Sequence, residues 1–255
     1  AFSVKSYNQP RREQRQQINQ AAREQGVLVV EEGGSTFNHN MTMMLDGVTG
    51  IEHNIPVAPL YKDVVDTWKQ TDVRNTPTLV VNYGGLNGEY YWYNKMNIWE
   101  NERFLKFYPR DALDVRSIRR ETAPEWDYYH IEVAKQAKRL RDAGIKIQIG
   151  GHGQMQGLSP NWEIWSLVQG GFSPWQALRA ATELGSIEPG KRADLVITNS
   201  NPLDDIQNTI DTAYVMVNGR LFDAATMAEI GGKQRPAPVF HFNQQQSGLS
   251  VGQEY

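Results

Sequence analysis

Strand-like and helix-like runs alternate along the first part of this chain. Helical patterns at 11–25, 41–45, 61–69 and 127–143 separate five short β-rich runs, which lie at 2–7, 26–32, 50–53, 78–83 and 145–149. The second run contains Val-Leu-Val-Val, a continuous apolar stretch typical of a strand buried on both faces. Alternation of this kind is typical of βα units around a parallel sheet, so the sequence predicts an α/β fold.

Toward the C-terminus the spacing of apolar residues changes from a helical pattern to short β-rich runs. Ser173-Pro174 offers an N-cap and a first-turn proline, and Ala177 and Ala181 recur at helical spacing behind them. A short β-rich run follows at 193–198, and two more flank an Asn-Gly pair within 212–222. These runs predict a helix followed by a small β-structure with a hairpin.

Composition excludes several classes of protein. The chain has 255 residues, a formal net charge of −3 and no cysteine, so it contains no disulfide or thiolate site and does not look like a nucleic-acid binder. No apolar run approaches the roughly 20 residues of a membrane span. Residues 1–5 do not resemble a signal peptide, because they lack a charged leader and an apolar core.

Two nearly consecutive segments resemble the metal-dependent amidohydrolase superfamily. They are Gly-Gly-Phe-Ser-Pro-Trp-Gln-Ala-Leu-Arg-Ala-Ala-Thr at 170–182 and Gly-Ser-Ile-Glu-Pro-Gly-Lys-Arg-Ala-Asp-Leu-Val at 185–196. In that superfamily the first segment is the last helix of a TIM (β/α)₈ barrel, and the second is a strand of a small β-sandwich. The resemblance therefore implies an α/β chain with strands four to eight of a partial TIM barrel at 1–182. C-terminal strands of the β-sandwich would follow at 183–235, and a tail at 236–255.

Five strands are too few to close an eight-stranded barrel, which needs about 250 residues by itself. The link at 182–185 is also shorter than in members of the superfamily. We expect the sequence to be an incomplete record of a longer polypeptide. The alternative is a naturally split protein that another chain completes.

The resemblance implies one or two divalent cations at the C-terminal mouth of the barrel, with zinc first and manganese as an alternative. Ile51-Glu52-His53 resembles the sixth-strand motif in which the histidine binds metal. Lys5 resembles the fourth-strand lysine that is carboxylated in some members, and Glu32 follows a strand where most members place a histidine. We prefer Glu32 to Glu31 because Glu31 belongs to the strand itself. The alternatives are a helix-capping or core-edge histidine at His53 and a surface lysine at Lys5.

His152 stands where the superfamily commonly has the aspartate that binds metal and accepts a proton from water. A neutral histidine, with an ordinary pKa of about 6.5, can also accept a proton. The glycines around it allow a ligand to approach closely, which favours a functional role over a buried structural one. We predict that His152 is a metal ligand or the general base.

Three further residues are candidates for substrate binding. Tyr83 and Tyr91 belong to an aromatic-rich stretch that continues as a long insertion at 84–124, and such insertions often form lids in barrel enzymes. His39 is the third candidate, and its alternative role is in the N-cap region before the helix at 41–45.

The resemblance implies a hydrolase that cleaves an amide, peptide or cyclic amide C–N bond with a metal-activated water. Imidazolonepropionase-like and prolidase-like enzymes are the most similar members, so a short peptide or a cyclic amide is the expected substrate. They suggest a periplasmic or secreted location and allow a homo-oligomer. The rival hypothesis is a non-catalytic binding protein that keeps the barrel but has lost its metal centre.

Overall fold

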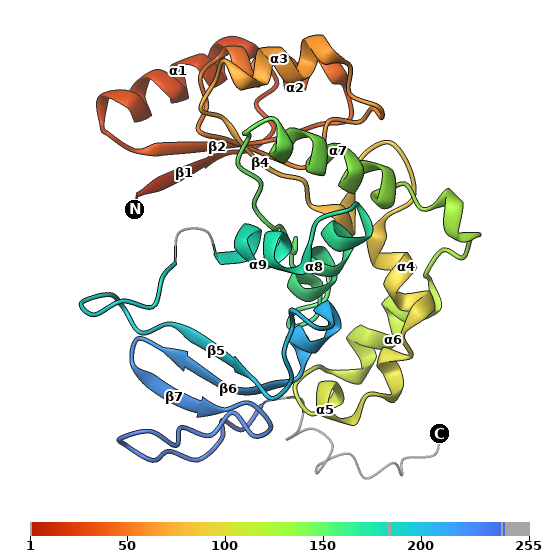
Figure 1. The fold of residues 1–255 in the computed structure, drawn as a ribbon, viewed down its shortest axis with the longest axis vertical. Coiled ribbons are helices and arrows are strands. Elements are labelled where there is room, and N and C mark those ends of the chain that lie inside the picture. The colour runs from red at the N-terminus through yellow and green to blue at the C-terminus, as the bar shows by residue number, and fades with distance from the viewer. Residues whose placement is uncertain (1, 183–184, 241, 243–255) are drawn as a thin grey trace, which may run out of the picture.

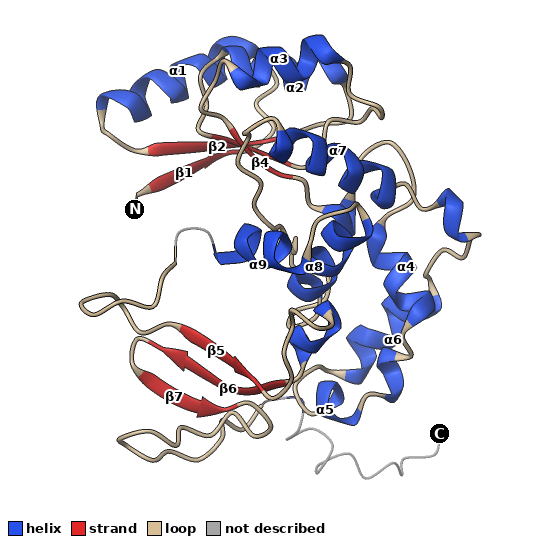
Figure 2. Ribbon diagram, in the orientation of Figure 1, coloured by secondary structure: helices blue, strands red, loops and turns tan. Residues whose placement is uncertain are grey.

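The computed structural model describes residues 2–182, 185–240 and 242, and these form two separate sheets with helices between them (Figures 1 and 2). The first sheet is parallel, in the order β1-β2-β3-β4, and its strands are Ser3–Ser6, Leu28–Glu32, Gly50–Glu52 and Arg74–Thr76. The second is antiparallel, in the order β5-β6-β7, with strands Leu195–Thr198, Thr212–Val217 and Arg220–Asp223. The predicted α/β class is confirmed.

Three helices cover one side of the parallel sheet (Figure 1). They are α1 (Arg12–Glu24), α2 (Phe37–Leu45) and α3 (Lys62–Lys69). Each helix follows a strand and returns the chain to the side of the sheet where the strands begin, as parallel pairing requires. As a result, the carboxyl ends of β1 to β4 meet at one edge.

The predicted strand at 78–83 is wrong. The strand β4 ends at Thr76, Thr78 has a left-handed φ of 54°, and Leu79–Val81 form a single turn of 3₁₀ helix. Leu79 and Val80 are fully buried, so the apolar run reflects burial rather than an extended backbone. The predicted strand at 145–149 is reduced to one parallel bridge between Ile147 and Asn75, beside β4.

The insertion at 84–124 folds into helices, which include α4 (Gly88–Lys95), α5 (Glu102–Leu105) and α6 (Arg110–Ile118). Tyr91, Trp92 and Tyr93 of α4 are buried in the main core, so these side chains pack inside the protein and do not line a lid over the site. The core continues into α7 (His130–Asp142), α8 (Ser159–Gln169) and α9 (Pro174–Thr182).

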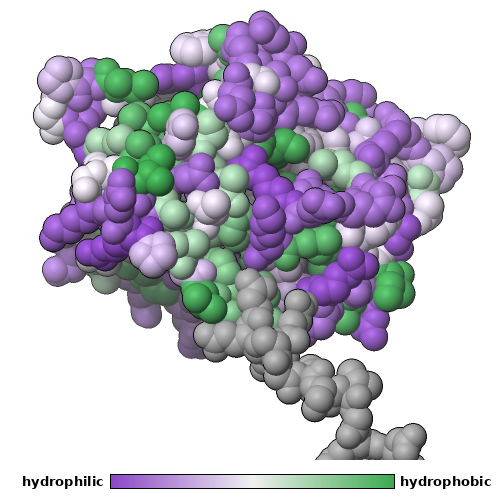
Figure 3. Space-filling view, turned by 90° about the horizontal axis from the view of Figure 1, so that it is seen from below, coloured by the Kyte–Doolittle hydropathy of each residue, from purple (hydrophilic) through white to green (hydrophobic). Residues whose placement is uncertain are grey.

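The C-terminal features agree with the sequence patterns. Helix α9 begins at Pro174, and the Ser173 hydroxyl accepts a hydrogen bond from the Gln176 backbone N–H at 3.2 Å, as an N-cap does. The strands β6 and β7 form the predicted hairpin, with positive φ at Asn218 and Gly219. Seen from below, this end of the molecule mixes hydrophobic and hydrophilic side chains (Figure 3).

Within the described residues the parallel strands do not close into a barrel. Residues 183–184 of the short link lie outside the described part of the chain, and the predicted tail at 236–255 is described only at 236–240 and 242. None of the described helices is both long and apolar enough to span a bilayer.

Candidate metal centre

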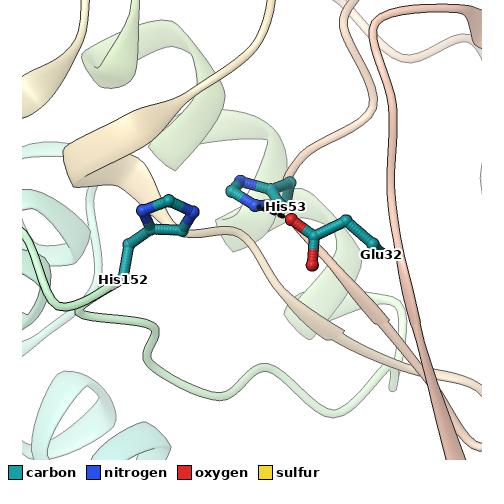
Figure 4. Close-up of side chains that lie close together, drawn as sticks. All are labelled: Glu32, His53 and His152. Atoms are coloured by element: carbon teal, nitrogen blue, oxygen red, sulfur yellow. Dashed lines mark hydrogen bonds and ion pairs between the residues drawn. The ribbon is translucent and has the colours of Figure 1, made fainter. Parts of the chain in front are cut away.

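Three predicted ligands lie together at the carboxyl edge of the parallel sheet. Glu32 is the last residue of β2, His53 follows β3, and His152 lies in the loop after the bridge at Ile147 (Figure 4). Each residue offers one ligand atom, and these atoms all lie within 4.8 Å of one another. Ligand atoms of a tetrahedral zinc ion are about 3.4 Å apart, given Zn–N and Zn–O distances near 2.1 Å, so small side-chain rotations would bring these three atoms to zinc-binding distances.

His53 has a hydrogen-bond acceptor against each ring nitrogen. Nδ1 lies 3.0 Å from the carbonyl oxygen of Val81, and Nε2 lies 2.8 Å from Oε1 of Glu32. A carbonyl and an ionised carboxylate only accept, whereas a neutral imidazole donates from one nitrogen. A neutral His53 can therefore donate to only one of these acceptors, and a divalent cation at Nε2 would satisfy the contact with Glu32. The site has the donor set and the charge for a divalent cation.

Glu32 is held in its ionised form. It is 4% exposed, and burial alone would raise its pKa. The hydrogen bond from Lys5 and the charge of His53 together outweigh burial, so the pKa of Glu32 lies below its ordinary value. Lys5 forms an ion pair with Oε2 of Glu32 while about half of its own side chain remains exposed.

Two buried asparagines hold the turn that carries His53. Asn75 donates from Nδ2 to the carbonyl oxygens of Ile51 and His53, at 3.1 and 2.9 Å. Asn54 accepts from the Tyr83 N–H at 2.8 Å and donates to the Tyr83 carbonyl at 2.9 Å. These amides keep His53 at its left-handed φ of 68°, a conformation that costs free energy in a non-glycine residue.

Glu163 supports the same region from α8. Its side chain is fully buried, and Oε2 accepts a hydrogen bond from the Val80 N–H at 3.2 Å. Burial raises the pKa of Glu163 to about 8, although the backbone N–H groups around it oppose the rise. Val80 precedes Val81, the residue whose carbonyl faces His53, so Glu163 helps to place that carbonyl.

His152 is the exposed member of the cluster. Its ring centroid lies 5.1 Å from that of His53, and its φ is 50°. Nδ1 of His152 lies 3.2 Å from Oε1 of Gln154. Both histidines therefore direct Nδ1 toward a carbonyl oxygen, an arrangement typical of histidines that bind metal through Nε2.

The three predicted substrate-binding residues lie in different surroundings, and Tyr83 is the one that lies beside the cluster. The Tyr83 ring centroid lies 5.1 Å from that of His53, so Tyr83 borders the cluster, and its pKa is raised by burial and by the charge of Glu32. Tyr91 lies in the core, with its ring against Tyr128 and His130. A substrate-binding role for Tyr91 therefore has no support from its surroundings.

His39 lies in α2, where its Nδ1 is 2.9 Å from the Arg15 guanidinium. Burial and then the charge of Arg15 lower the pKa of His39, so this ring accepts from Arg15 and contributes to helix packing. The side chains of Glu31 and Glu32 point to opposite faces of β2, as successive strand residues do. Glu31 faces Arg15 at 3.5 Å, so the face of the strand, rather than its end, distinguishes the two carboxylates.

A cavity of about 750 Å³ lies elsewhere, between α5 and the antiparallel sheet. Its lining includes Phe104 and Phe222, and it includes none of the residues in the cluster of Glu32, His53 and His152. The cavity wall is largely apolar and none of the residues that line it is a histidine, whereas the cluster combines two imidazoles with a carboxylate.

The backbone of the chain is similar to those of three solved hydrolases. One is a Xaa-Pro dipeptidase with methionine bound in its active site, with a TM-score of 0.55, 19% identity, and coverage of 82% of this chain and 48% of that one. The fold is shared. The second is molinate hydrolase, with a TM-score of 0.55, 15% identity, and coverage of 81% and 45%. The third is phenylurea hydrolase B, with a TM-score of 0.51, 21% identity, and coverage of 81% and 45%.

The chain thus spans just under half the length of each of these proteins. No protein-family model matches the sequence, and no curated protein matches it either. The similarity is one of backbone architecture.

Proposed function

We propose that the protein is a metal-dependent hydrolase of amide or peptide C–N bonds. The observation that carries the proposal is the position of His53, whose Nε2 faces the ionised carboxylate of Glu32 at 2.8 Å with His152 beside it. A divalent cation at this point would replace the proton between the two groups. Zinc suits the mixed imidazole and carboxylate donors.

A cation bound there supplies Lewis acidity to a carbonyl group and to a water molecule. His53 and Glu32 would hold it, and His152 would complete the ligand set or accept a proton from the attacking water. Tyr83 borders the cluster and would contact the substrate. Lys5 would either neutralise Glu32, as its ion pair does, or bind metal after carboxylation, for which its amine must first lose its proton.

We further propose that the parallel sheet is a part of a (β/α)₈ barrel, namely strands four to eight, with Ile147 marking the last of them. The shared fold supports this assignment, and so does the parallel bridge of Ile147 to β4. The antiparallel sheet would then belong to the small β-sandwich, and the chain would correspond to the C-terminal part of such an enzyme. Because one similar structure is a Xaa-Pro dipeptidase, a Xaa-Pro dipeptide is the first substrate to test.

The test is hydrolysis of a Xaa-Pro dipeptide by the zinc-loaded protein, with release of free proline as the readout. His152→Ala should lower kcat by at least about 100-fold, the usual effect of losing a general acid or base. His152→Asp should retain bound metal and part of the activity, because a carboxylate can also bind metal and accept a proton. Unchanged kcat in His152→Ala with metal retained would remove His152 from the mechanism. Absence of bound metal would favour the rival binding protein, which has lost its metal centre, and bound zinc without hydrolysis of the dipeptide would contradict this substrate.

A further inference from the structure

A chain of polar contacts extends from His152 into the helical insertion. His152 Nδ1 lies 3.2 Å from Oε1 of Gln154, and Nε2 of Gln154 donates to Oε2 of Glu89 at 2.9 Å. Glu89 belongs to α4 and is 4% exposed, so its carboxylate is shielded from water. The proposed function assigns no role to Gln154 or Glu89.

Glu89 determines which way the Gln154 amide points. A carboxylate can only accept hydrogen bonds, so it must face the NH₂ end of the amide. Nη1 of Arg116 lies 3.4 Å from the other oxygen of Glu89 and stabilises the negative charge there. The carbonyl oxygen of Gln154 is therefore the end that faces His152.

That orientation determines which ring nitrogen of His152 carries the proton. The amide oxygen of Gln154 can only accept, so Nδ1 of His152 carries the proton and Nε2 keeps its lone pair. The geometry points to Gln154, oriented by Glu89, as a positioning residue that maintains the Nδ1–H tautomer of His152. It leaves Nε2 free to bind metal or to accept a proton, and only this use of Nε2 rests on the proposed function.

His152 needs such a contact more than His53 does. His53 is 2% exposed, and the partly buried Val81 presents its backbone carbonyl to Nδ1 of His53. His152 is exposed, follows two glycines, and has a left-handed φ of 50°. A side-chain contact that is itself fixed by a buried carboxylate therefore replaces the packing that the exposed His152 ring lacks.

The direct test is the tautomer of His152 in the metal-free protein, read from histidine ring ¹⁵N chemical shifts. We expect the Nδ1–H form in the wild type and a mixture of tautomers in Gln154→Met, which keeps the side-chain length but removes the acceptor. Gln156→Met is the matched control, because Gln156 is exposed in the same loop, and it should give the wild-type shifts. Glu89→Gln offers the amide an acceptor oxygen and should also keep the tautomer, whereas Glu89→Met should not.

A second measurement is zinc affinity by competition with a chelator. Gln154→Met should bind zinc about 10- to 100-fold more weakly than the wild type and Gln156→Met, the usual effect of losing a group that orients a ligand. An Nε2–H tautomer in the wild type, or unchanged shifts in Gln154→Met, would overturn the inference. Absence of zinc binding in a wild type that shows the Nδ1–H tautomer would overturn the proposed metal site and leave the tautomer assignment standing.

Discussion

Replacement of Glu163 by glutamine should change how the stability of the protein depends on pH. Glu163 is fully buried, and burial raises its pKa to about 8 from an ordinary 4.5. In the unfolded chain the carboxyl loses its proton above about 4.5, while the folded protein retains it up to about 8. Because the unfolded state then binds fewer protons, the free energy of unfolding must fall as pH rises through this window.

The size of the effect follows from the two pKa values. A difference of about 3.5 units corresponds to about 5 kcal/mol, lost between pH 4.5 and 8 at up to about 1.4 kcal/mol per pH unit. Glutamine has the shape of the protonated acid and keeps an acceptor for the Val80 N–H, but it does not titrate. The stability of the wild type relative to Glu163→Gln should therefore fall across this window and level off above about pH 8.

Comparison of the two proteins removes contributions that they share. Burial also raises the pKa of Glu31 to about 7 and lowers that of His130 to about 4, and these shifts act in opposite directions between pH 4.5 and 6.5. Urea denaturation of both proteins at each pH from 5 to 9 gives the difference directly. Glu13→Gln, at an exposed position of α1, is the control and should leave the pH dependence unchanged. A difference that stays flat, or rises with pH, would refute the assignment of a protonated Glu163.

Two glycines give further predictions about stability. Gly170, at the end of α8, packs against Ala134 of α7, and an added Cβ would lie 2.4 Å from the backbone and Cβ of Ala134. Gly170→Ala should therefore lower the free energy of unfolding by about 1–3 kcal/mol and leave zinc affinity unchanged. An unaltered urea midpoint would contradict that close contact. Gly219 has a φ of 77° in the β6–β7 turn, so Gly219→Ala should cost about 1–2 kcal/mol in thermal unfolding, and a smaller loss would show that the turn relaxes.

The sequence predicted those parts of the fold that local patterns determine. The apolar run of β2, the Ser173-Pro174 start of α9 and the Asn218-Gly219 turn all lie where their residue types predict. The run at 78–83 has the apolar pattern of a strand but forms a 3₁₀ turn, because Leu79 and Val80 are buried and burial alone produces the same pattern.

Some residues of the candidate site can also be predicted from local sequence patterns, whereas the contacts that support them cannot. Glu32, His53 and His152 are predicted as ligands from a resemblance to strand-end positions, and the structure brings their ligand atoms together because parallel strands place their carboxyl ends at one edge. The contact between Gln154 and Glu89 joins residues 65 apart in the sequence, and that between Glu163 and Val80 joins residues 83 apart. No local pattern marks such pairs, because only tertiary packing brings them together.

Titration calorimetry of zinc binding to the wild type and to variants of its proposed ligands tests the metal centre itself. The wild type should bind a single zinc ion, and His53→Ala and Glu32→Gln should each weaken binding by more than the roughly 10- to 100-fold expected for a supporting residue. Glu52→Gln, one residue before His53 in β3, should bind as the wild type does. Zinc affinity that is absent in the wild type, or that survives unchanged in His53→Ala, would contradict a metal centre at this edge of the sheet.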